Sequence, residues 1–99
     1  MLTSKQRAYL KGLAMTIDAT IQIGRTGLTP EVTASVEEAL AARELVKVNV
    51  QKNDPEDLRE TAATLAERTR SQVVQVIGRK IVLYRQGKEN RKKITLPKQ

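Results

Sequence analysis

Residues 20–30 read TIQIGRTGLTP, and this stretch sets the architecture because it joins a strand, a loop and a helix start. Residues 20–23 alternate and are rich in β-branched side chains, which predicts a short strand. Thr29 can cap a helix, and Pro30 suits the first helical position. The segment therefore predicts a strand–loop–helix unit whose loop is Gly24-Arg25-Thr26-Gly27.

The G-x-x-G loop, Gly24 to Gly27, has two interpretations. Glycine allows another backbone to approach closely, and a helix start offers unpaired N–H groups and the positive end of a dipole. Together with Arg25, these features could hold an anion such as a phosphate. The same residues could equally form a tight turn and nothing more. The spacing alone does not decide between the two.

The rest of the chain shows the same two periodicities. Thr3 and Gln6 have capping-box spacing, and apolar residues then recur at helical intervals. Val46, Val48 and Val50 alternate with polar residues, as in a half-buried strand. Helices are predicted for about 4–15, from 30 through 40, and 54–68, and strands for 20–23, 46–50, 73–77 and 81–84.

The order of elements, α-β-α-β-α-β-β, predicts an α/β fold with a four-stranded mixed sheet packed with helices. Strands separated by helices favour parallel pairing with right-handed crossovers. Gly78-Arg79-Lys80 is short enough for a hairpin, so the last two strands should be antiparallel. Helices in so short a chain cannot fully cover both faces of the sheet, and we expect one face to be partly open.

The composition excludes several classes of site. The 99 residues suit one domain with an aliphatic core, because Phe and Trp are absent. Cys and His are also absent, which removes disulfides, thiolate metal sites and the usual general base. No apolar run approaches a membrane span, and the N-terminus lacks a signal-peptide core. We therefore expect a cytoplasmic protein that does not associate with membranes.

Charge is distributed unevenly along the chain. The net charge is +7, but residues 31–70 carry nine acids against six bases, and residues 71–99 carry eight bases against Glu89 alone. A basic face built from both ends of the chain would suit a polyanion such as nucleic acid. A solvated basic tail that aids solubility is the alternative.

Five segments, in order, resemble the CRM domain family in its stand-alone bacterial, YhbY-like form: LTSKQRAYLKGLA at 2–14, IQIGRTGLT at 21–29, ARELVKVNV at 42–50, VVQVIGRKIVLYR at 73–85 and KENRKKITLP at 88–97. The resemblance implies a fold similar to the C-terminal domain of translation initiation factor three. It also implies RNA binding through the G-x-x-G loop, in association with precursor large ribosomal subunits. Plant relatives act in organelle intron splicing. Met15 and Gln86 depart from the family pattern, which often has His and Pro there.

With this resemblance, residues 1–86 are predicted to form the CRM-like domain and residues 87–99 a basic tail. The tail has little to bury, so we expect it to be mostly mobile, with Ile94 and Leu96 laid on the domain. Arg7 and Lys11 share a helix face, where they could bind phosphate or simply be solvated. Tyr84 is expected to pack rather than to stack on a base. The predicted RNA-binding residues are Gly24, Arg25, Thr26, Gly27, Arg7, Lys11, Arg79, Lys80, Arg85, Lys88, Arg91, Lys92 and Lys93.

The expected function is RNA binding without catalysis or cofactor, by a monomer, with ribosomal RNA of an assembling large subunit as partner. No Walker-type loop or metal-ligand cluster is present, and no small-molecule substrate is expected. The carboxylates fit exposed helix faces and helix starts: Glu31, Glu37, Glu38, Asp54, Glu56 and Asp57. An alternative is a protein-interaction module whose acidic middle helices dock a ribosomal protein. DNA binding is a weaker alternative, because no helix carries a basic, base-reading stripe.

Overall fold

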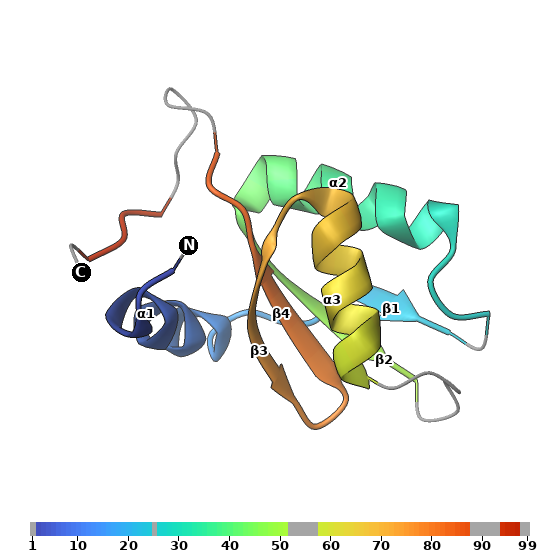
Figure 1. Cartoon of the computed structure of the whole chain (residues 1–99), viewed down its shortest axis with the longest axis horizontal. Coiled ribbons are helices and arrows are strands. Elements are labelled where there is room, and N and C mark those ends of the chain that lie inside the picture. Colours follow the sequence, from blue (N-terminus) through green and yellow to red (C-terminus); the bar gives the residue numbers. More distant parts are fainter. Residues whose placement is uncertain (1, 25, 52–57, 88–93, 98–99) are drawn as a thin grey trace.

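The computed structural model describes residues 2–24, 26–51, 58–87 and 94–97. The elements follow the predicted order (Figure 1). The helices are α1 (Ser4–Ala14), α2 (Pro30–Arg43) and α3 (Leu58–Thr69), and the strands are β1 (Ile21–Ile23), β2 (Leu45–Val50), β3 (Gln72–Ile77) and β4 (Lys80–Tyr84). Arg25, the Asp54-Pro55 helix start and the cations from Lys88 to Lys93 lie outside the described residues.

Local capping explains where two of the helices begin. Thr3 Oγ1 accepts from Gln6 N at 3.1 Å, and Gln6 Oε1 accepts from Thr3 N at 3.0 Å, which completes the predicted capping box of α1. Thr29 Oγ1 accepts from Val32 N at 3.2 Å, and Pro30 occupies the first turn of α2. Both predicted helix starts are confirmed.

The sheet order is β1-β2-β4-β3. β1 pairs in parallel with β2, whereas β4 is antiparallel to both β2 and β3. Parallel pairing across a helical crossover is thus confirmed for β1 and β2. It is wrong for β2 and β3, which run in the same direction but are separated by β4. The short turn at Gly78 and Arg79 returns β4 beside β3, and its other edge then pairs with β2.

The two faces of the sheet have different covers. α2 and α3 lie on one face, where they pack against alternate β2 residues Val46, Val48 and Val50. α1 lies on the opposite face and buries Leu10 and Ala14 (Figure 1). β2 also presents Lys47 and Asn49 to a groove beside α1, so this second face is partly open, as predicted.

A C-terminal segment returns to the α1 side of the sheet. Ile94 and Leu96 pack against the apolar cluster beneath α1, as predicted, and Gln6 Nε2 donates to Pro97 O at 3.1 Å. Glu44, only 1% exposed, accepts from Ile94 N at 2.7 Å and also from Gly87 N. The segment therefore pairs with a buried carboxylate, which the sequence did not reveal.

Glu44 also ends α2 in an unusual backbone conformation. Its φ of 67° lies in the left-handed region, which is costly for a residue other than glycine. Its amide donates to Leu40 O at 2.9 Å, and its carbonyl accepts from Arg85 N at 2.9 Å. One residue thus connects α2, the end of β4 and the C-terminal segment.

In the described part of the chain, no helix has the length and apolar character needed to cross a membrane.

Candidate nucleic-acid interface

A groove of about 850 Å³ lies between α1 and the uncovered part of the sheet. We call it the α1 groove. Residues from one helix, three strands and the β3–β4 turn line it: Ala8, Lys11, Gly12, Ala14, Met15, Lys47, Asn49, Gln75, Ile77, Gly78, Arg79 and Lys80. Two predicted RNA-binding regions, around Lys11 and around Arg79-Lys80, therefore meet at one site.

The charged residues that line the α1 groove are all positive. They are Lys11, Lys47, Arg79 and Lys80, and no Asp or Glu lines the groove among the residues that the structure describes. Lys11 and Lys80 are exposed, whereas Lys47 is half-buried. A concave surface with charge of one sign concentrates the field and attracts an opposite charge, here a polyanion.

Lys47 is a groove residue that the sequence prediction missed. Its Nζ donates to Ala14 O at 3.1 Å and to Ile17 O at 3.3 Å, at the end of α1. This position stabilises the last carbonyls and the negative end of the helix dipole. The alternation of β2 was the signal that could have found it, because Lys47 and Asn49 must face away from the buried valines.

Arg79 fixes the β3–β4 turn to the end of β2. Its Nε donates to Val50 O at 3.3 Å, and its Nη2 donates to Gln51 O. Val50 N in turn donates to Arg79 O at 2.7 Å. Arg79 remains exposed, so it adds positive charge to the rim of the groove while holding the turn in place.

The G-x-x-G loop lies next to this turn. Gln51 N donates to Ile23 O at 2.9 Å, which links the end of β2 to the residue before Gly24. Gly27 N donates to Gly24 O at 3.0 Å, the i+3 to i hydrogen bond typical of a β-turn. The loop and the α1 groove are therefore connected through Gln51 and Arg79.

The fold requires glycine at one of the two glycine positions of the loop but not at the other. Gly27 has φ of 72°, a conformation that disfavours a side chain. Gly24 does not have positive φ, and a Cβ there would meet only the Gln51 side chain, at 3.7 Å, an ordinary contact. The turn thus explains Gly27 and leaves Gly24 unexplained by the fold, as expected if a ligand passes close to it.

The start of α2 is satisfied within the protein. Thr29 caps Val32 N, and Glu31 brings a negative charge to the first turn. Glu31 complements the helix dipole, so the attraction of this end for an external phosphate is reduced. Thr26, in the neighbouring G-x-x-G loop, is exposed.

Two other predicted cations donate to backbone carbonyls. Arg7 Nη1 donates to Val73 O and, at 3.4 Å, to Val74 O. These carbonyls lie where the register of β3 shifts between Val73 and Gln75, as in a β-bulge. Arg7 does not line the α1 groove, and its contacts support the local structure of β3.

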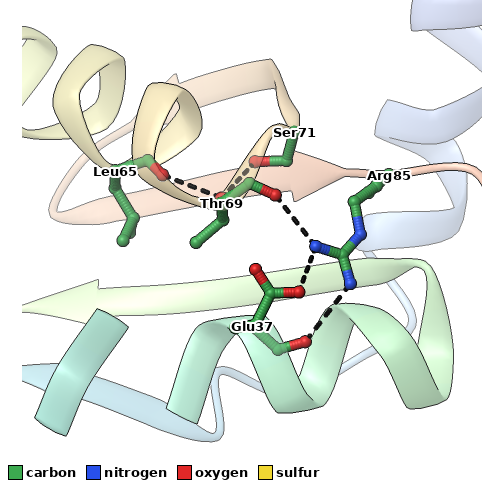
Figure 2. Close-up of polar contacts among 5 residues, drawn as sticks. All are labelled: Glu37, Leu65, Thr69, Ser71 and Arg85. Carbon is green, nitrogen blue, oxygen red and sulfur yellow. Dashed lines mark hydrogen bonds and ion pairs between the residues drawn. The ribbon is translucent and has the colours of Figure 1, made fainter. Parts of the chain in front are cut away.

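Arg85 lies between two helices (Figure 2). It forms an ion pair with Glu37 of α2 and donates to Thr69 O at 2.9 Å, at the end of α3. Thr69 is buried, and its hydroxyl donates to Leu65 O at 2.8 Å. Arg85 therefore joins α2, α3 and β4 and does not line the groove.

Tyr84 is part of the core, as predicted. It is 2% exposed and packs in the cluster beneath α1. Its buried hydroxyl has no hydrogen-bond partner in the described part of the chain. Burial and, secondarily, the Glu44 carboxylate raise the pKa of this hydroxyl above its ordinary value of 10.0. Base stacking would require Tyr84 to leave the core.

The described residues contain no group of three or more His, Cys, Asp or Glu that could hold a metal.

Comparison with known proteins gives consistent similarities. The family model of the CRS1 / YhbY (CRM) domain matches residues 2–85. A Bacillus subtilis protein named "Probable RNA-binding protein YqeI" is 44% identical, over 98% of this chain and 100% of its own. A Haemophilus influenzae protein named "RNA-binding protein" is 39% identical, over 98% and 96% respectively. The solution structure of a hypothetical Staphylococcus aureus protein, a candidate RNA-binding protein, matches with a TM-score of 0.83 and 49% identity, covering 98% of this chain and 100% of that one.

Proposed function

We propose, since this chain belongs to the CRS1 / YhbY (CRM) domain family, that it binds RNA with the α1 groove and the adjoining G-x-x-G loop. The observation that carries the proposal is the positive charge of the groove, whose charged lining residues in the described part of the chain are Lys11, Lys47, Arg79 and Lys80. Relatives named as RNA-binding proteins support RNA as the polyanion. The proposed activity is binding, with no catalytic step.

The RNA that we propose is ribosomal RNA of a large subunit during its assembly. This is the partner that the resemblance to YhbY-like proteins implies. The α1 groove supplies lysines for phosphates, and the cations between Lys88 and Lys93 add charge along the chain. Such contacts release condensed counterions, so electrostatics supplies most of the affinity.

The charge of the groove can be tested with Lys11→Glu combined with Lys80→Glu. Roughly a hundredfold loss of affinity for ribosomal RNA fragments is expected, about tenfold for each reversed contact, with a flatter salt dependence. Lys5→Glu is the matched control, because Lys5 is an exposed cation of the same helix outside the groove. A loss of affinity in Lys5→Glu of about tenfold, equal to that expected for each reversed groove lysine, would show that only net charge matters.

The loop can be tested with Arg25→Glu. Affinity should fall by about tenfold, as for a charge reversal at one phosphate contact, while the melting temperature stays unchanged. An unchanged affinity would contradict the role of the loop. Loss of the fold would assign Arg25 a structural role.

A separate pair of charge-reversal variants tests the alternative, that the acidic helices dock a protein. Glu31→Lys and Glu38→Lys reverse exposed charges of α2, whereas Glu37 is unsuitable because it pairs with Arg85. RNA binding predicts that affinity is kept or raised. If these variants no longer associate with ribosomal particles, α2 is the docking surface.

The identity of the RNA requires a measurement in cells. Crosslinked RNA should map to precursor large-subunit ribosomal RNA, and should be depleted in the Lys11→Glu, Lys80→Glu variant. Reads spread evenly over messenger RNA in both proteins would contradict the ribosomal proposal.

A further inference from the structure

Two rows of residues across three strands underlie the α1 groove, and all of them except the buried Val82 line it. The strand register aligns Asn49, Lys80 and Ile77 in one row, and Lys47, Val82 and Gln75 in the next. The irregularity in β3 keeps Val73 and Val76 in the core of the opposite face while Gln75 and Ile77 line the groove. The two rows therefore place a pair of side-chain amides, Asn49 and Gln75, among the cations.

These amides are available to a ligand. Asn49 and Gln75 are half-buried, and within the described residues neither side-chain amide has a hydrogen-bond partner. Each amide therefore keeps a donor and an acceptor that a ligand in the groove can reach. A phosphate can only accept hydrogen bonds, so it would satisfy half of that capacity. The edge of a nucleobase offers donors and acceptors together.

Large apolar side chains line the same groove. Met15 is 84% exposed and Ile77 is 56% exposed, although most apolar side chains of this size in the chain are buried. An adaptable thioether and a branched aliphatic side chain can cover the flat face of a base. Their exposure beside Lys11 and Lys80 combines surfaces for a base and for its phosphates.

Gly12 leaves additional room above these residues. It lies within α1, where glycine costs about 1 kcal/mol relative to alanine. A Cβ at Gly12 would meet no protein atom within 4 Å, so packing in the protein does not require glycine. The groove volume of about 850 Å³ lies in the range of small-molecule sites, roughly 300–1,000 Å³, and exceeds the need of one nucleotide.

We propose that the α1 groove holds one unpaired nucleotide of the bound RNA. Its base contacts Met15 and Ile77, and its edge hydrogen-bonds to Asn49 and Gln75. Lys11 and Lys80 bind the flanking phosphates. This inference rests on the proposed RNA binding and specifies its substrate as RNA with a bulged or single-stranded nucleotide. A paired base of an A-form duplex is stacked within the helix, whereas a bulged or single-stranded base can be splayed out into the groove.

The test compares two hairpin RNAs that are identical except for one nucleotide bulged from the stem, with each of the four bases at the bulge. The protein should bind at least one bulged RNA about tenfold or more tightly than the paired RNA. Asn49→Ala combined with Gln75→Ala should remove that preference, so that bulged and paired RNA bind with about equal affinity. Gln86→Ala is the matched control, an exposed amide outside the groove.

A second measurement reports the base directly. With 2-aminopurine at the bulge, its fluorescence should change on binding to the wild-type protein but not to the double amide variant. Gly12→Ala should raise the melting temperature and reduce the preference for bulged over paired RNA. Equal, salt-sensitive affinity for bulged and paired RNA would overturn this inference and leave RNA binding intact. Failure to bind either RNA would overturn both.

Discussion

Glu44→Gln should destabilise the protein through the C-terminal segment. The carboxylate is 1% exposed and accepts from the amides of Gly87 and Ile94. A hydrogen bond to a charged group contributes about 1.5–3 kcal/mol, and an amide can retain only part of two such bonds. We therefore expect a loss of roughly 2–4 kcal/mol in the free energy of unfolding, measured in urea. For a domain of this size the melting temperature should fall by at least about 8 °C.

Glu44→Gln in a chain that ends at Gln86 tests whether the loss of stability comes from the hydrogen bonds to the C-terminal segment. That chain lacks both donors, so Glu44→Gln should cost less than about 1 kcal/mol there. The truncation itself should be destabilising, because it leaves a buried carboxylate without these two partners. Glu38→Gln, at an exposed carboxylate of the same helix, is the control and should change little in either chain. Equal costs of Glu44→Gln in the two chains would refute the coupling.

Further predictions concern a pH effect, an ion pair and the tail. The pKa of Tyr84 is raised above 10.0 in the folded state, so its hydroxyl loses the proton more readily in the unfolded state. The free energy of unfolding should therefore fall as the pH rises above 10. Tyr84→Phe should remove that slope in pH-dependent unfolding. Arg85→Ala should cost about 1–3 kcal/mol by leaving Thr69 O and Glu37 without this donor, with RNA affinity unchanged once the protein is folded; a selective loss of affinity would make Arg85 an RNA contact. Replacing Lys88, Arg91, Lys92 and Lys93 by Gln should reduce the salt slope of RNA binding by about 3, whereas an unchanged slope would show that the tail does not bind RNA.

Sequence reasoning predicted the elements of the fold because their signals are local. The Thr3 capping box, the Thr29-Pro30 helix start and the alternation of β2 each depend on residues a few positions apart. The insertion of β4 between β2 and β3 depends on which free edge the hairpin meets, and no local pattern encodes that choice. The crossover rule therefore predicted the direction of β3 correctly and its neighbour wrongly.

The candidate site was predicted in part for the same reason. Lys11, Arg79 and Lys80 were identified from charge and position, and the fold brings them to one groove. Lys47 follows from strand alternation but was overlooked. Arg7 and Arg85 resemble the other cations in the sequence, yet their partners are backbone carbonyls of distant segments, which only the folded chain brings near. The role of Glu44 was likewise invisible, because a buried acid has no local signature.

The contact of Arg7 with β3 has a consequence for self-association. β3 is an outer strand of the sheet, and such a strand offers backbone groups on which a second chain can add. Arg7 occupies the carbonyls of Val73 and Val74, and the bulge beside them breaks the regular ladder. A charged side chain and a bulge are both devices that prevent edge-to-edge aggregation. Through Arg7 and the bulge, the same helix that forms one wall of the groove makes β3 a poor template for strand addition by a second chain.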